Sequence, residues 1–203
     1  VLVGWNLKMP TVQTHQGVYK YPLGTVSSYL WDRHEGHGWI KEVEVVRRSI
    51  DDKGRLHSRR LLTLLSPSPL LLRPILGAAS RPFYLVEDVI VDLEAQKMHV
   101  RTQNANLGAL CSSRSESVYE PDGENPRWTQ YKVVAETAAF QGKEKGPPST
   151  TSIIGSGDER TSWGSIGRSL ERFVGGLVLG NVRTGETRIN EWAAAMRARH
   201  AQG

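Results

Sequence analysis

The sequence predicts an α+β protein in which consecutive β-strands form an antiparallel meander and a long helical region follows them. Three observations predict this class. Candidate strands recur between residues 12 and 140, short polar turns join several of them, and residues 162–199 repeat apolar side chains at helical spacing. Links of hairpin length cannot contain the crossover connections that parallel strands need, so we expect antiparallel pairing rather than βαβ units.

The composition predicts one domain, over residues 1–203, with a hydrophobic core of its own. Hydrophobic residues make up 38% of the chain and charged residues 23%, which are ordinary values for a globular protein. The net charge of +5 favours an anionic membrane or a nucleic acid as partner without selecting either. Cys111 is the only cysteine, which excludes an internal disulfide and a cysteine-built zinc site. We expect neither a membrane-spanning segment nor a signal peptide.

The first candidate strand, residues 12–21, leads into a predicted helix that begins at Pro22 and reaches Arg33. Val26, Tyr29 and Leu30 form the apolar stripe of this helix. The following HEGHG segment, residues 34–38, resembles a metal motif only superficially, because its histidines are three apart and separated by glycine. We interpret it as a loop.

Residues 39–50 and 55–65 are predicted to form a β-hairpin around the turn Asp51–Gly54. Aspartates can bond nearby backbone N–H groups, and Gly54 can adopt the positive φ that closes a short turn. Beyond the turn, one face of the strand carries Leu56, Ser58, Arg60, Leu62 and Leu64. Arg60 is the charged member of a mostly apolar row, and a charge that faces a core needs a partner. Two interpretations stay open: an ion-paired or rim-exposed arginine, and an anion site within an apolar cavity.

The segment SPSPLLLRPILG, residues 66–77, interrupts the strands and is rich in aliphatic residues between prolines. These aliphatic residues are Leu70, Leu71, Leu72, Ile75 and Leu76. The segment is equally compatible with a short core helix and with an exposed lid that touches a membrane.

Four further strands are predicted at residues 83–91, 97–103, 111–119 and 128–140, before a flexible loop rich in glycine, proline and serine at residues 141–159. The final helical region carries one apolar stripe that is extended by a polar residue: Ile166, Leu170, Phe173, Val174, Leu177 and Asn181. Thr184-Gly185 is a candidate interruption. A second apolar face of Ile189, Trp192, Ala193 and Met196 then ends in a basic tail.

The sequence gives no support to an enzyme, and we expect neither a cofactor nor a bound metal. It has no phosphate-cradling glycine loop with a lysine. Asp88, Asp92 and Glu94 lie near one another, and we interpret them as solvated or ion-paired carboxylates at strand ends. A nucleic-acid partner is not expected either, because no strand combines aromatic and basic residues in a recognition motif.

Several of these segments, taken together and in order, resemble the PRELI/MSF1 family. The resemblance rests on Y-x-Y-P, W-x-R and R-x-I-D-x-x-G-x-L across residues 19–62, and it continues to Asn181 through segments near residues 84–92, 102–104, 116–129 and 170–173. It implies a seven-stranded, curved antiparallel sheet whose concave side is covered by a long C-terminal helix, with a short lid helix or loop.

The resemblance also implies a function. Members of this family carry phosphatidic acid or phosphatidylserine across the mitochondrial intermembrane space, in complex with a small disulfide-bonded helical-hairpin protein. By motif match, the headgroup residues of this chain are Arg33, Arg60 and Asn181, with Arg183 as a neighbouring cation, and the lid is residues 70–76. The expected ligand is therefore an anionic phospholipid, taken from an anionic membrane surface.

Two positions depart from the family pattern. Leu177 and Thr184 stand where the family has lysines, and the loss of two cations is expected to weaken phosphate capture. This departure keeps a second hypothesis open, in which the chain is a non-catalytic structural subunit of a larger mitochondrial membrane complex. The sequence does not select the phospholipid, the partner or the oligomeric state.

Overall fold

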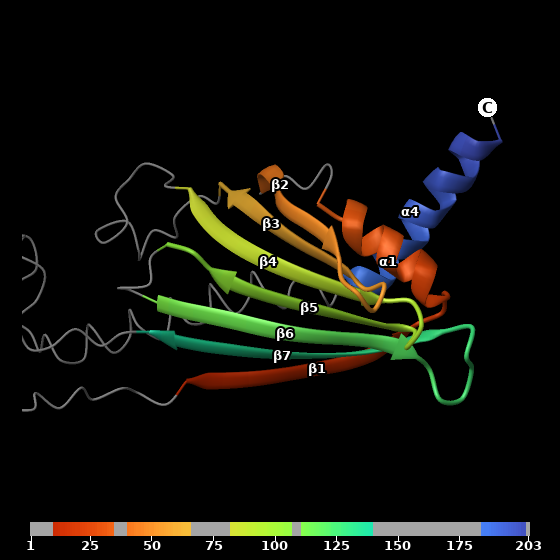
Figure 1. Ribbon diagram of the computed structural model, residues 1–203, viewed down its shortest axis with the longest axis horizontal. Coiled ribbons are helices and arrows are strands. Elements are labelled where there is room, and N and C mark those ends of the chain that lie inside the picture. Colours follow the sequence, from red (N-terminus) through yellow and green to blue (C-terminus); the bar gives the residue numbers. More distant parts are fainter. Residues whose placement is uncertain (1–9, 35–39, 66–81, 107–110, 140–183, 202–203) are drawn as a thin grey trace, which may run out of the picture.

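The computed structural model describes residues 10–34, 40–65, 82–106, 111–139 and 184–201 (Figure 1). Its strands are β1 (Thr11–Tyr19), β2 (Ile40–Ile50), β3 (Leu56–Leu64), β4 (Phe83–Asp92), β5 (Lys97–Asn104), β6 (Cys111–Pro121) and β7 (Thr129–Ala139). They form one seven-stranded sheet in the order β1-β7-β6-β5-β4-β3-β2, and every neighbouring pair is antiparallel. The predicted fold class, with this strand number, is confirmed.

The predicted hairpin between β2 and β3 is confirmed in its turn chemistry. The Asp51 carboxylate accepts hydrogen bonds from the backbone N–H groups of Lys53 and Arg55, at 3.0 and 2.9 Å. Gly54 has a φ of 73°, which a side chain would disfavour. Beyond the turn, Ser58, Arg60, Leu62 and Leu64 are buried, so this row of β3 faces inward as its alternation predicts.

Helix α1 (Leu23–Asp32) packs on the inner face of the sheet. Pro22 precedes it as N-cap, and the helix buries Leu23, Val26, Tyr29 and Leu30, which confirms the predicted apolar stripe. These side chains share one core with sheet residues that include Val89, Met98, Val100, Tyr119, Tyr131 and Val133. The helix is thereby fixed over the middle strands.

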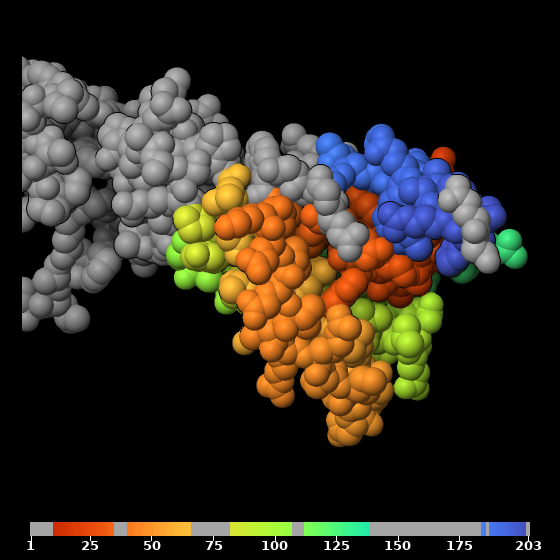
Figure 2. All heavy atoms as spheres, turned by 90° about the horizontal axis from the view of Figure 1, so that it is seen from above, coloured from red at the N-terminus to blue at the C-terminus, as the bar shows by residue number. Residues whose placement is uncertain are grey.

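Helix α4 (Gly185–His200) lies against α1 (Figures 1 and 2). The Trp192 indole N–H donates to Asp32 at the end of α1, at 3.2 Å, and the Tyr21 hydroxyl donates to Asn190 at 2.8 Å. Ile189 and Ala193 are buried, so the predicted apolar face of this segment is confirmed. The helix begins at a glycine because a Cβ at Gly185 would come within 2.3 Å of the Tyr19 hydroxyl oxygen.

Several predictions fall outside the described residues. These are the HEGHG loop beyond His34, the lid at residues 70–76, the flexible loop at residues 141–159, and the helical stripe from Ile166 to Asn181 together with Arg183. They stay predictions. Within the described part, no helix combines the length and apolar character that a membrane crossing requires.

Candidate functional site

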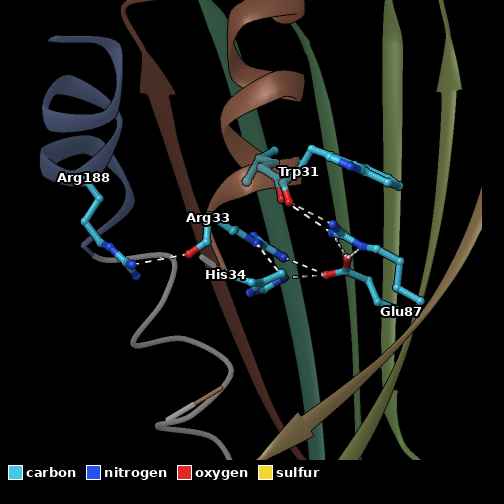
Figure 3. A network of polar contacts seen from close by, with 7 residues as sticks. Trp31, Arg33, His34, Glu87 and Arg188 are labelled. Carbon is cyan, nitrogen blue, oxygen red and sulfur yellow. Dashed lines mark hydrogen bonds and ion pairs between the residues drawn. The ribbon is translucent and has the colours of Figure 1, made fainter. Parts of the chain in front are cut away.

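The candidate site forms where α1 ends above β3 and β4 (Figure 3). The last carbonyl groups of a helix have no partner within the helix and must find one elsewhere. Arg60 of β3 supplies it by donating to the Trp31 carbonyl at 3.0 Å and to the Leu30 carbonyl at 3.5 Å. A cation at this end of a helix is also favoured by the helix dipole. Arg60 therefore joins α1 to the sheet.

The partner of Arg60 is Glu87, its neighbour in β4. One carboxylate oxygen, Oε1, accepts hydrogen bonds from Nε of Arg60, at 2.9 Å, and from its Nη2. The other oxygen, Oε2, accepts from Nη2 of Arg33 at 2.8 Å. The side chains of Arg60 and Glu87 are only 3% and 1% exposed, whereas that of Arg33 is 16% exposed. A single buried carboxylate thus holds two arginines from α1 and β3.

The electrostatics of the site favour the charged form of this trio. Burial alone would raise the pKa of Glu87, but Arg33, His34 and Arg60 together hold it well below its usual range. Burial would likewise lower the pKa of Arg33, and Glu87 raises it instead. One anion therefore faces two cations, so the cluster keeps a positive excess.

His34 completes the cluster as a neutral side chain. Burial, together with the nearby guanidinium of Arg33, lowers the pKa of His34 to about 4 even though the Glu87 carboxylate opposes the shift. Its Nε2 lies 3.4 Å from Nε of Arg33 and 3.8 Å from Oε2 of Glu87. A neutral imidazole nitrogen accepts hydrogen bonds, so His34 orients the Arg33 guanidinium without adding charge.

The indole ring of Trp31 covers two arginines, Arg60 and Arg48. The guanidinium carbon of Arg60 lies 4.2 Å from the ring centroid, and that of Arg48 in β2 lies 4.4 Å from it. Such cation–π contacts hold a planar guanidinium in a fixed orientation. Beside the ring is a cavity of about 10 Å³, lined among others by Leu30, Arg33, Arg60, Val89 and Met98. This space accommodates about one water molecule.

The structure thus brings together two of the four predicted headgroup residues, Arg33 and Arg60, and describes neither Asn181 nor Arg183. Arg60 is buried and ion-paired, as one of its two interpretations predicts. The headgroup role of Arg33 and Arg60 stays a prediction.

Glu87 is not among the candidate site residues predicted from the sequence. A signal for it existed, because Leu85, Glu87 and Val89 alternate along β4, and a lone carboxylate in that inward row needs a cationic partner.

Comparisons with known proteins give a consistent result. Residues 26–144 match the model of the PRELI-like family. PRELI domain-containing protein 1, mitochondrial, from Gallus gallus is 32% identical over 120 residues, which cover 57% of this chain and 55% of the relative. The protein of that name from Homo sapiens is 29% identical over 121 residues, covering 58% and 55%. The matched region therefore spans about half the length of these curated relatives.

A solved structure supports the architecture. The Zhui aromatase/cyclase from Streptomyces sp. R1128 superimposes with a TM-score of 0.51 at 10% sequence identity, and the match covers 96% of this chain and 99% of that one. At this identity the likeness concerns the fold alone.

Proposed function

This chain belongs to the PRELI-like family, and from that premise we propose that it binds an anionic phospholipid, phosphatidic acid or phosphatidylserine, and carries it between mitochondrial membranes. The curated relatives are named mitochondrial proteins. The compartment that we propose is the intermembrane space, or the periphery of the inner membrane. The function needs no covalent chemistry, so we propose a carrier and not an enzyme.

The position of Arg33 supports this proposal most directly. Its guanidinium lies at the end of α1, is partly exposed, and lines a cavity whose other walls include the apolar side chains of Leu30, Val89 and Met98. A guanidinium that is partly exposed and held in a fixed orientation is complementary to the phosphate of a phospholipid. His34 and Glu87 hold this guanidinium in place before any ligand arrives.

The remaining parts of the proposed carrier lie outside the described residues. Asn181 and Arg183 would complete the headgroup site with Arg33 and Arg60, and residues 70–76 would form the lid. A small disulfide-bonded helical-hairpin protein is the proposed partner during transfer, and an anionic membrane surface is the donor.

Transfer of fluorescent phosphatidic acid between vesicles tests the proposal. Arg33→Gln removes one charge-assisted contact, so we expect the affinity for the lipid to fall about tenfold or more per folded molecule. Arg59→Gln is the matched control, because it removes the same charge from the opposite, exposed face of β3. Equal affinities of wild type and Arg33→Gln would contradict the headgroup role, and a wild-type protein without transfer would contradict the carrier.

Replacing Leu71 and Leu72 by Ser tests the lid. A lid that touches the membrane predicts slower transfer with little change in the unfolding temperature. A large fall in that temperature, without a specific effect on transfer, would instead identify these residues as ordinary core, where each truncation costs about 2–5 kcal/mol.

One observation favours the alternative, a non-catalytic structural subunit of a larger mitochondrial complex. Both described headgroup candidates already bond a carboxylate of the chain itself, so a phosphate must compete with Glu87 for them. A structural subunit would purify within a large complex and would not exchange labelled phosphatidic acid. Measured exchange would exclude this alternative.

A further inference from the structure

Unlike Arg33 and Arg60, Arg48 has no carboxylate partner within the described part of the chain. It lies in β2, one of the two edge strands of the sheet, and is exposed. Its guanidinium is held by the Trp31 ring at 4.4 Å, whereas Arg33 and Arg60 both bond Glu87. Of these three arginines, Arg48 is therefore the one whose charge no carboxylate of the described residues compensates.

The sheet register places a second unsatisfied group beside Arg48. Its cross-strand neighbour in β3 is Ser58, so both side chains project from the same face of the sheet about 5 Å apart. Ser58 is 4% exposed, and its hydroxyl is the one buried side-chain polar atom of the described residues that has no hydrogen-bond partner. A buried hydroxyl without a partner is unfavourable, and such groups commonly mark a place that a ligand or water completes.

The charges around this pair favour an anion. On the inward face of β2, β3 and β4, the cations are Arg48 and Arg60 and the single carboxylate is Glu87, which Arg60 and Arg33 occupy. Glu42, Glu44 and Asp88 project from the opposite face, as their cross-strand partners Thr63, Leu61 and Arg59 show. Ser58 lies between the two inward arginines, with Arg48 across the strand pair and Arg60 two residues along.

We propose that Arg48 and Ser58, beside the ring of Trp31, form an outer phosphate subsite that receives the headgroup of the phospholipid before it reaches Arg33. This inference rests on the proposed function, and it adds two residues to which the resemblance assigns no role at the headgroup. The guanidinium fork of Arg48 binds two phosphate oxygens and the Ser58 hydroxyl donates to a third. Arg48 is exposed, and when it turns toward the headgroup its charge-assisted bonds to the phosphate replace its cation–π contact with Trp31.

Three variants separate this subsite from general surface charge. Arg48→Gln removes the guanidinium, and Arg47→Gln is its matched control, because Arg47 is the adjacent exposed residue and projects with Arg59 from the opposite face. We expect Arg48→Gln to weaken binding to phosphatidic acid vesicles about tenfold and Arg47→Gln less than twofold. Ser58→Ala should weaken binding several-fold while leaving the unfolding temperature unchanged or raised, because it removes an unsatisfied hydroxyl.

A titration of the ¹⁵N-labelled chain distinguishes the two sources of a phosphate group. Inorganic phosphate and soluble dihexanoyl phosphatidic acid are added separately, and NMR follows the Arg48 Nε–H and Ser58 amide signals. Shifts with both probes, or with the lipid alone, support the proposed subsite. Shifts with inorganic phosphate alone overturn the assignment to a lipid headgroup.

The remaining outcomes separate the subsite from the proposed function. Transfer of lipid by the wild-type protein without any response at Arg48 and Ser58 overturns the subsite and leaves the carrier intact. Absence of transfer together with a response to dihexanoyl phosphatidic acid overturns the carrier and supports the subsite. Equal losses of binding in Arg48→Gln and Arg47→Gln overturn the subsite, because general surface charge then explains the binding.

Discussion

Strands β3 and β4 carry two arginine–carboxylate pairs in consecutive positions, and the sheet directs them to opposite faces. Arg59 and Asp88 pair on the outer face, where their side chains are 56% and 33% exposed. Arg60 and Glu87 pair on the inner face, where the corresponding values are 3% and 1%. Each pair joins an arginine of β3 to the carboxylate directly opposite it in β4. The two pairs therefore differ mainly in how far water reaches their side chains.

This comparison teaches which charges are required for the fold. Water solvates Arg59 and Asp88 whether or not they touch, so their contact adds little free energy. Arg60 and Glu87 have lost that solvation, and each now depends on the other and on Arg33, His34 and the last carbonyls of α1. The inner pair therefore holds the end of α1 and the Arg33 guanidinium in place, which makes it a precondition of the proposed headgroup site.

The largest expected effect comes from Glu87→Gln. The change leaves the buried Arg60 and the partly exposed Arg33 without a counter-charge, and breaking a buried pair in this way costs about 3–5 kcal/mol of unfolding free energy. Denaturant unfolding measures the loss, with Asp88→Asn on the outer face as control. A loss below about 1 kcal/mol would mean that water reaches the inner pair and that the two faces do not differ.

A somewhat smaller loss is expected for Arg60→Leu. If Arg60 were unpaired, replacing it by leucine would leave the stability of the fold unchanged or increase it, because a buried charge would be removed. Since Arg60 is paired with Glu87, we expect the opposite result. Glu87 keeps Arg33 as a partner, while the Trp31 carbonyl loses its donor, so we expect a loss of about 2–3 kcal/mol. Unfolding experiments on Arg60→Leu and on the Arg60→Leu/Glu87→Leu double variant measure it. Equal or greater stability of Arg60→Leu would argue against the Glu87 pairing.

The inward position of Arg60 could be predicted from the sequence, and its partner could not. Alternation along β3 assigns Arg60 to the same face as Leu62 and Leu64, because side chains of a strand alternate strictly. Its pairing with Glu87 depends on the register between β3 and β4, and alternation within each strand does not fix that register. The contact of Arg33 with Glu87 also depends on how α1 packs on the sheet, which its apolar stripe indicates only as a face.

His34 makes the stability of the inner cluster depend on pH. Its pKa is about 4 in the folded chain, mainly because it is buried, against 6.5 for an exposed histidine. Between these values the unfolded chain binds a proton that the folded chain does not, so stability falls as the pH falls below about 6.5. The expected contribution is about 2 kcal/mol at pH 5. The unfolding free energy of wild type and of His34→Gln, measured at pH 7 and at pH 5, tests this contribution. An equal fall in both proteins between the two pH values would show that the pKa of His34 is not lowered in the folded chain.

The smallest effect is expected for the outer pair, and it provides the reference for the others. Asp88→Asn removes the carboxylate that accepts from Nε of Arg59 at 2.7 Å and from its Nη2 at 3.1 Å. The two hydrogen bonds are well aligned, but both side chains are exposed to water. The unfolding free energy should therefore fall by only about 0.2–1 kcal/mol. Added salt should reduce the difference further, because exposed charges are screened within about 10 Å at 0.1 M ionic strength. A loss comparable to that of Glu87→Gln, insensitive to salt, would show that pair geometry and not burial determines the stability of this sheet.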